Sequence, residues 1–168
     1  MGAEVERLLE QIDPDQFDAT LSHLRDAQRT WFFSGQGRSG LVASMVAMRF
    51  MQLGRPVHVQ GEATAPAIRE GDGLLVISGS AETPVSLHHA RVAKEHGASV
   101  VLVTHEPSGP LARMAEAVLV LPAEHSHQFG GSLFEQGALL ALDAIVLALA
   151  RESHVAFDDM MRRHTNLR

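Results

Sequence analysis

Short apolar runs alternate with helical segments along most of this chain. Strands that are apolar along most of their length are typical of a parallel sheet covered on both faces. Five runs fit this description: WFFSG (31–35), PVHVQ (56–60), GLLVIS (73–78), SVVLVT (99–104) and AVLVLP (117–122). Helices are expected between them near residues 39–53, 83–96 and 110–115. The alternation predicts an α/β fold, a three-layer αβα sandwich built on a five-stranded parallel sheet.

Helices are also predicted at both ends of the chain. AEVERLLEQI repeats apolar residues at three- and four-residue spacing, which is typical of one helix face. Asp13 is then a candidate N-cap with Pro14 at the first helical position, and the next helix should run to about Gln28. A long helix over about 132–152 closes the fold. We expect one domain over residues 1–168, with N-terminal helices (1–29), an α/β core (30–122) and a C-terminal helix and tail (131–168).

Composition excludes several classes of protein. The chain has no cysteine, so it has neither disulfides nor thiolate metal sites, which agrees with a cytoplasmic location. Its N-terminus lacks the basic and apolar regions of a secretory signal. The most apolar segment, residues 138–150, is interrupted by Asp143 and is too short to span a membrane. A net charge of −6 argues against nucleic-acid binding, which depends on neutralising phosphates with Lys and Arg.

The first loop of interest, SGQGRSG, follows the first predicted strand. Gly35, Gly37 and Gly40 form a G-x-G-x-x-G pattern, which is a weak signal for dinucleotide binding on its own. A dinucleotide site also needs an acidic residue about 20 positions on, and Glu62 falls two residues beyond that point. Ser39 is a candidate N-cap whose hydroxyl could face an anion. This loop alone leaves open an NAD site, another phosphate site or a simple tight turn.

The second loop, SGSAETP, follows the third predicted strand. Thr83 and Pro84 form a candidate helix cap, but capping does not require the two serines as well. A glycine, three hydroxyls and a helix N-terminus within six residues make a compact site for one tetrahedral dianion. The residues of this cradle are Ser78, Gly79, Ser80, Ala81 and Thr83. A sugar carrying a single phosphate fits two such loops better than a dinucleotide does.

These motifs together resemble a known family. GQGRSG, GDGLLVISGSAET and VVLVTHEPSGPLARMAEAVLVLP are similar to the sugar isomerase (SIS) domain over roughly residues 30–122. The segments GGSLFEQGALLALDAIVLAL and MMRRHTNLR are similar to those of the 6-phospho-3-hexuloisomerase family. The resemblance implies interconversion of D-arabino-hex-3-ulose 6-phosphate and D-fructose 6-phosphate in the ribulose monophosphate pathway. It also implies a homotetramer with sites near subunit interfaces and no redox cofactor.

Two other functions remain open beside this one. SIS modules serve as noncatalytic sugar-phosphate sensors in some regulators, usually beside a further domain. An isomerase acting on another sugar phosphate is the nearest competitor within the enzyme class.

The chain departs from the family pattern at two places. Ala81 stands where the family usually has glycine, so the loop must either avoid a positive φ or absorb strain. The tail reads RHTNLR where the family usually has RHANLE, and it keeps the histidine at position 164.

The resemblance assigns catalytic roles to two residues. Moving a carbonyl between C3 and C2 requires a base near a carbon-bound proton and an acid near the oxygens. Glu135 matches the family's catalytic glutamate, although Ser132 and Glu135 also have the spacing of a capping box. His164 is the candidate acid or base for ring opening or oxygen protonation, and it could act in a neighbouring subunit.

Other candidate ligand contacts rest on weaker signals. Gly37, Arg38 and Ser39 are expected to line the phosphate site, with Arg38 as the charge partner of phosphate or sugar oxygens. Arg49 and Glu62 are further candidates, Arg49 more as a structural or interface residue. The chain has 10 histidines, but their spacing does not match a recognised metal site, so no metal is expected.

Overall fold

The computed structural model describes residues 1–123 and 126–166 and contains the expected parallel sheet. Its five strands are β1 (Trp31–Gly35), β2 (Val57–Val59), β3 (Gly73–Ile77), β4 (Ser99–Thr104) and β5 (Ala117–Val120). All neighbouring strands pair in parallel, in the order β2-β1-β3-β4-β5. This is a doubly wound order: β2 is added on one side of β1 and the later strands on the other, so the strand order reverses between β1 and β3.

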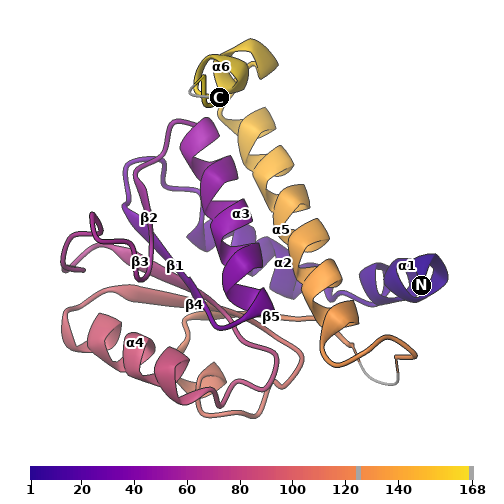
Figure 1. The fold of residues 1–168 in the computed structure, drawn as a ribbon. Coiled ribbons are helices and arrows are strands. Elements are labelled where there is room, and N and C mark those ends of the chain that lie inside the picture. The colour runs from indigo at the N-terminus through magenta and orange to yellow at the C-terminus, as the bar shows by residue number, and fades with distance from the viewer. Residues whose placement is uncertain (124–125, 167–168) are drawn as a thin grey trace.

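Helices cover both faces of the sheet (Figure 1). One layer contains α1 (Gly2–Glu10), α2 (Pro14–His23), α3 (Arg38–Gln52) and α5 (Ser132–Glu152). The opposite layer contains α4 (Pro84–Glu95) and the short 3₁₀ helix η1 (Ala112–Met114). A last short helix, α6 (Phe157–Arg162), lies beside the C-terminal end of α3. The predicted fold class, a three-layer α/β sandwich, is confirmed.

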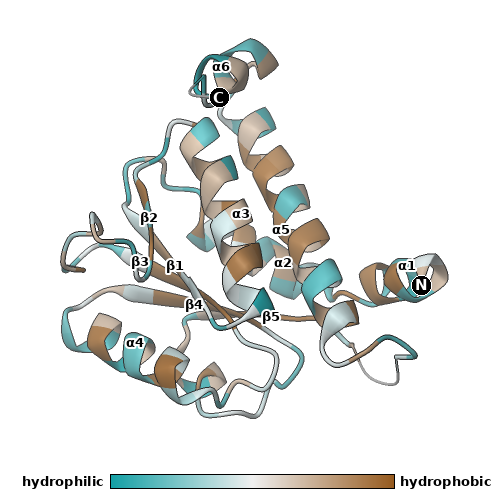
Figure 2. Ribbon diagram, viewed as in Figure 1, coloured by the Kyte–Doolittle hydropathy of each residue, from teal (hydrophilic) through white to brown (hydrophobic). Residues whose placement is uncertain are grey.

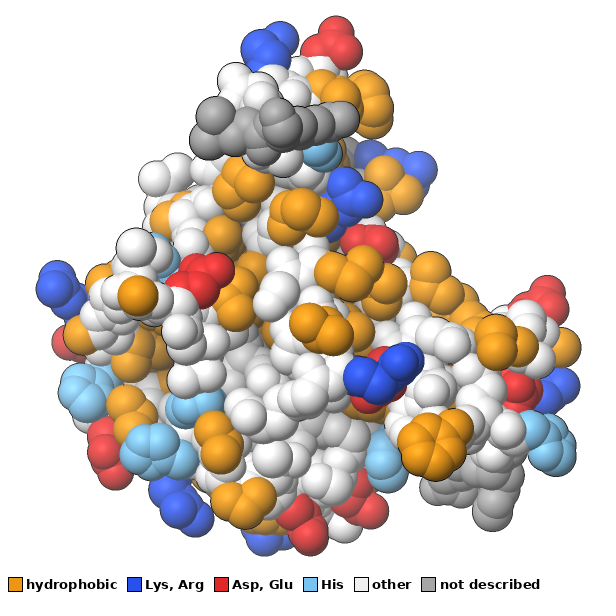
Figure 3. Space-filling model, viewed as in Figure 1, with side chains coloured by type: hydrophobic (Ala, Val, Ile, Leu, Met, Phe, Trp, Pro, Cys, Tyr) orange, Lys and Arg blue, Asp and Glu red, His pale blue; other side chains and the backbone are white. Residues whose placement is uncertain are grey.

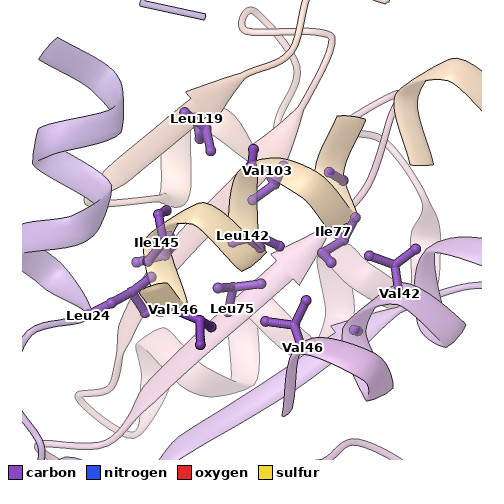
Figure 4. Packing of buried hydrophobic residues seen from close by; sticks show 14 of the residues in the cluster. Leu24, Val42, Val46, Leu75, Ile77, Val103, Leu119, Leu142, Ile145 and Val146 are labelled. Atoms are coloured by element: carbon purple, nitrogen blue, oxygen red, sulfur yellow. The ribbon is translucent and has the colours of Figure 1, made fainter. Parts of the chain in front are cut away.

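Two hydrophobic clusters hold the layers together. The larger lies between the sheet and the α3–α5 layer (Figure 4), where residues such as Val46, Leu75 and Leu142 are buried. The smaller lies under α4 and includes Leu74, Val76 and Leu102. Successive residues of β3 therefore enter opposite clusters, as the pleat of a strand covered on both faces requires. Brown and teal bands alternate along α3 and α5 in Figure 2, because only one side of each helix faces the core.

α5 is long and apolar enough to cross a membrane by length and composition, but 56% of that stretch is buried inside the fold. It packs on α3 and on the N-terminal helices. We therefore interpret it as a core helix, which agrees with the sequence-based interpretation of residues 138–150.

The helices of the structure differ from the predicted ones in three places. The second helix ends at His23 rather than near Gln28, because the Asp26 carboxylate accepts a hydrogen bond from the Gln28 amide and stabilises a turn. The segment predicted as a helix over 110–115 forms only the single turn of η1. The helix α6 was not predicted, since six residues are too few to show a periodic pattern. Asp13, by contrast, caps α2 as predicted, accepting from the Asp15 amide at 2.9 Å.

Candidate functional site

The carboxyl ends of β1 and β3 lie side by side at the point where the strand order reverses. Gly35, the last residue of β1, pairs with Ile77, the last residue of β3. Ligands of open α/β sheets bind in the crevice outside such a switch point. Both loops that the sequence singled out, residues 35–40 and 78–83, begin there.

The three glycines of the first loop have different functions. A Cβ on Gly35 would lie 2.6 Å from the backbone carbon of Ser39, and one on Gly40 would lie 2.8 Å from the Gly35 oxygen. These two glycines therefore allow the strand and helix to pack closely. Gly37 has a φ of +57° and no atom within 4 Å of an added Cβ. Only Gly37 leaves open space beside the backbone, as a ligand-binding loop needs.

The first loop leads directly into the N-terminus of α3. The N-cap is Gly37, so the prediction that Ser39 is the N-cap is wrong; Ser39 is the second helical residue. Gly37 takes the cap position because its positive φ makes the turn from strand to helix, which a serine would adopt only with strain. The cap supplies no side chain to the helix, so the first-turn N–H groups of α3 remain suited to bind an anion.

The second loop gathers its hydroxyl groups above the start of α4. Thr83 is the N-cap by position, as predicted, but its side chain makes no hydrogen bond to the helix. Its Oγ1 instead lies 3.3 Å from the Oγ of Ser78, which is buried at the end of β3. The Glu82 amide donates to the Oγ of Ser80 at 3.3 Å. The loop thus brings hydroxyls and a helix N-terminus together in the form predicted for a phosphate cradle.

Ala81 has a φ of +52° and is completely buried. Of the two outcomes expected from the sequence, avoiding a positive φ or absorbing strain, the structure shows the second: Ala81 adopts the left-handed region and carries the strain. Its methyl group occupies space next to Gly109, where an added Cβ would lie only 2.6 Å from the Ala81 Cβ. The absence of a side chain at Gly109 is what accommodates alanine at this position.

Gly109→Ala is expected to reduce the free energy of unfolding by about 1–3 kcal/mol, because it overpacks this contact. Ala81→Gly alone should be nearly neutral, since relief of about 1–2 kcal/mol of left-handed strain offsets the loss of a methyl worth about 0.8 kcal/mol. The double variant should recover part of the loss caused by Gly109→Ala, as measured by urea denaturation. Additive effects of the two substitutions would contradict this account.

Glu135 lies in the first turn of α5 and forms an ion pair with Arg38, the first residue of α3. The Glu135 side chain is 13% exposed, whereas that of Arg38 is 62% exposed. The capping box that the spacing of Ser132 and Glu135 allows does not form: Gly131 is the N-cap, and the hydroxyl of Ser132 donates to the Phe129 carbonyl instead. The Glu135 carboxylate is thus directed at the first phosphate loop rather than at its own helix.

The second loop also approaches the start of α5. A Cβ at Gly79 would lie 3.1 Å from Cδ2 of His105 and 3.5 Å from Cδ1 of Phe134, the residue before Glu135. The Gly79 carbonyl accepts from the Thr104 hydroxyl at 2.7 Å and from the His105 amide at 3.3 Å. The end of β4 therefore joins the site. His105 is not among the residues predicted from the sequence, although its position directly after the predicted strand 99–104 is a usable signal.

A hydrogen bond connects β1, which leads into the first loop, with α4, which follows the second loop. Ser34, just before the first loop, contacts the Nδ1 of His89 at 2.9 Å, and His89 lies on α4 just after the second loop. Burial lowers the pKa of His89 below its usual 6.5, and repulsion from His88 lowers it further. The histidine is therefore neutral in the folded protein near pH 7 and fixes the spacing of β1 and α4.

This shift predicts a pH-dependent stability. A base whose folded pKa is lowered contributes stability that is present above pH 6.5 and is lost as the pH falls through the folded value. His89→Gln should therefore flatten the fall in unfolding free energy between about pH 7.5 and pH 5. Urea denaturation of both proteins across this range measures the effect. Equal slopes in the two proteins would contradict the assignment.

The structure does not bring three of the predicted residues to this site within one chain. Arg49 contacts Gln52 at 3.0 Å and lies 3.9 Å from Asp143 of α5, which is a structural position. Glu62 is exposed and accepts from the Val59 amide at 3.3 Å, in the turn after the edge strand β2.

His164 lies at the opposite end of α3 from the two loops. The neighbouring Arg163 donates to the carbonyl of Gln52, the last residue of α3, at 3.0 Å. Arg38 begins the same helix, so a helical rise of 1.5 Å per residue separates the two ends by about 21 Å. The last two tail residues, 167 and 168, lie outside the described part of the chain.

Within the described residues, no group of three or more His, Cys, Asp or Glu side chains is arranged to hold a metal ion. One of the pair considered for chelation, His125, lies outside the described residues.

Comparison with known proteins shows the family of this chain. The family model described as "SIS domain" matches residues 23–156. A 3-hexulose-6-phosphate isomerase of Mycobacterium gastri is 40% identical, over 98% of this chain and 86% of that protein. One from Bacillus subtilis is 33% identical, over 93% and 89%.

A solved structure from Methanococcus jannaschii, described as inferring a function of 3-hexulose-6-phosphate isomerase, superimposes with a TM-score of 0.89. It is 28% identical and the match covers 99% of this chain and 96% of that one. The chain belongs to the SIS domain family, as the resemblance of its loops predicted.

Proposed function

We propose that this protein is an isomerase that interconverts D-arabino-hex-3-ulose 6-phosphate and D-fructose 6-phosphate, a step of the ribulose monophosphate pathway. Relatives named 3-hexulose-6-phosphate isomerase match nearly the whole chain. The observation that carries the proposal is the convergence of two phosphate-type loops on the start of α5, where Glu135 lies: Arg38 of the first loop pairs with Glu135, and Gly79 of the second faces Phe134. Phosphate groups hold the substrate at such loops, and a carboxylate can move a carbon-bound proton.

The two helix N-termini bind the phosphate in this proposal. Gly37 and Ser39 lie at the N-terminus of α3, and the cradle from Ser78 to Thr83 leads into the N-terminus of α4. Backbone N–H groups and the helix dipoles favour a dianion there. The exposed Arg38 guanidinium is the adjacent positive charge.

Glu135 is the proposed base. It removes the proton from C3 of fructose 6-phosphate, the C–H electrons form the C2–C3 double bond, and O2 takes up a proton to give an enediol. A proton is then returned to C2 while the C3 hydroxyl loses its proton, which gives the 3-ketose. Before substrate binds, Arg38 holds the carboxylate in place. Because a phosphate dianion also attracts the guanidinium, binding draws Arg38 toward the phosphate and leaves the carboxylate free to accept a proton. No redox cofactor takes part in this step, because the carbonyl and alcohol exchange oxidation states within one molecule.

We propose that His164 acts in the site of a second subunit. The α3–α5 face carries exposed hydrophobic side chains along its length (Figure 3): Leu41, Met45, Met48 and Met51 on α3 and Leu140 and Leu147 on α5. Exposed apolar patches of this kind mark protein interfaces. Glu135 lies at one end of this face and His164 at the other. A two-fold axis through the middle of the face would therefore place His164 of one copy near Glu135 of its partner.

Met45→Glu is expected to dissociate the assembly and to abolish most of the isomerase activity, because it buries a charge in the proposed interface. His96→Glu, at an exposed residue at the far end of α4 on the opposite face of the sheet, is the control and should change neither property. Analytical ultracentrifugation and the isomerase assay measure the two effects. An active monomeric Met45→Glu variant would contradict the shared site.

Mixing two inactive variants tests the shared site more directly. Glu135→Gln and His164→Gln proteins, unfolded together and refolded, should regain up to about one quarter of the wild-type activity in a dimeric exchange. Only mixed dimers have one site with both residues intact. No recovery would show that both residues serve the same chain's site.

The proposed reaction is tested by a coupled assay. A hexulose-phosphate synthase supplies the 3-ketose from formaldehyde and ribulose 5-phosphate, and formation of fructose 6-phosphate is measured without added cofactor. We expect saturable turnover by the purified protein. Tight binding of fructose 6-phosphate with no isomerisation of any ketose phosphate would instead favour a noncatalytic sensor.

A further inference from the structure

The end of β4 carries a histidine beside the phosphate cradle that neither the motifs nor the proposed reaction uses. The ring of His105 lies edge-on to Phe134, with ring centroids 5.8 Å apart and planes inclined by 75°. On its other side, the ring faces Gly79, where an added Cβ would lie 3.4 Å from the imidazole Nε2. The imidazole thus stands between the cradle and the residue before Glu135.

The His105 ring is free to meet a ligand. It is exposed, and no hydrogen-bond partner contacts either ring nitrogen among the residues that the structure describes. It borders a hollow of about 380 Å³ that Ser80 of the cradle also lines. The backbone of His105 is fixed by its amide bond to Gly79, and Phe134 limits the ring orientation.

The carboxylates around this hollow make a hydrogen-bond donor necessary for phosphate binding there. Glu82 and Glu106 both line it, as does Arg113, and Arg38 at the start of α3 is already paired with Glu135. Arg113 donates to the Ser108 carbonyl at 2.6 Å, which holds it in the loop after β4. A phosphate dianion arriving beside these carboxylates would be repelled unless another donor offsets them. The imidazole of His105 can supply such a donor, neutral or protonated.

We propose that His105 is a further substrate-binding residue, which donates a hydrogen bond from its imidazole to the phosphate held by the second loop. This inference rests on the proposed phosphate site but not on the isomerase reaction. This contact also explains the glycine at position 79, because a side chain there would fill the space between the His105 ring and the cradle.

Binding measurements with two probes, fructose 6-phosphate and inorganic phosphate, test the role of His105. His105→Phe keeps the ring contact with Phe134 but removes the donor, so a purely structural role would survive the change. We expect both probes to bind about tenfold more weakly, because a hydrogen bond to a charged group is lost. His105→Gln, which retains a donor, should bind both probes more tightly than the phenylalanine variant. His96→Phe, at the far end of α4, is the control and should bind like the wild type.

The outcomes separate this inference from the isomerase proposal. Wild-type affinity in His105→Phe would overturn the inference whether or not the protein isomerises the sugar. Weaker binding of fructose 6-phosphate with unchanged binding of inorganic phosphate would also overturn it, because the contact would then be to the sugar. If His105→Phe binds both probes more weakly and the wild type isomerises no ketose phosphate, the binding role of His105 is supported and the proposed reaction is refuted. Failure of the wild type to bind either probe would refute both.

Discussion

Glu135→Gln is expected to lower kcat by about 10²–10⁴-fold, the usual contribution of a general base. Glutamine has nearly the same shape but cannot accept a proton from carbon. The substitution also removes the ion pair with Arg38, which leaves the guanidinium available to phosphate. Affinity for fructose 6-phosphate should therefore be kept or increased. Steady-state kinetics and calorimetric titration measure the two quantities separately.

Glu62→Gln is the matched control, because that carboxylate is exposed and bonded to its own turn after β2. It should leave both kcat and affinity unchanged. Wild-type turnover in Glu135→Gln would remove Glu135 from the mechanism. A loss of affinity equal to the loss of rate would show that the residue binds the substrate instead.

Gly35→Ala is expected to have the largest effect on stability, at least about 3 kcal/mol and above the usual range for overpacking. Its Cβ would lie 2.6 Å, 2.7 Å and 2.8 Å from backbone atoms of Ser39 and Gly40. Backbone atoms at the start of α3 cannot rotate away as a side chain can. The strand and helix would have to separate, disturbing the packing of α3 on β1. Thermal and urea denaturation measure the loss.

Gly37→Ala is the comparison within the same loop. No atom lies within 4 Å of its added Cβ, so only the positive φ is strained, at a cost of about 1–2 kcal/mol. This variant should remain folded but bind fructose 6-phosphate more weakly, because Gly37 lies where the ligand approaches. Equal stability of the two variants would contradict the division of the loop into packing and binding glycines.

The sheet could be predicted from the sequence because most of its strands are nearly continuous apolar runs, as in GLLVI and VVLV. The ends of the helices could not be predicted in this way, because there side chains compete with the helix for backbone hydrogen bonds. The second helix stops early because Asp26 offers the backbone an alternative partner, and within residues 110–115 only the single 3₁₀ turn of η1 forms. Such choices depend on a few hydrogen bonds rather than on a repeated pattern.

Much of the candidate site could also be predicted, because loops after adjacent parallel strands meet at one edge of the sheet. Spacing could not decide which way a side chain turns. Ser132 and Glu135 have the spacing of a capping box, yet the glutamate pairs with Arg38 at the start of the neighbouring helix α3. His105 escaped notice because its role depends on contacts with Gly79 and Phe134, which are distant in the sequence.

The measurement that tests the central claim most directly is solvent hydrogen exchange into fructose 6-phosphate. Incubation with the protein in D₂O, followed by NMR spectroscopy, shows which carbon gains deuterium. A C2–C3 enediol predicts deuterium at C3 of fructose 6-phosphate, together with formation of the 3-ketose and with no cofactor added. Deuterium at C1 would indicate an aldose-forming isomerase instead. Neither exchange nor 3-ketose from a protein that binds the sugar phosphate would contradict the proposed activity altogether.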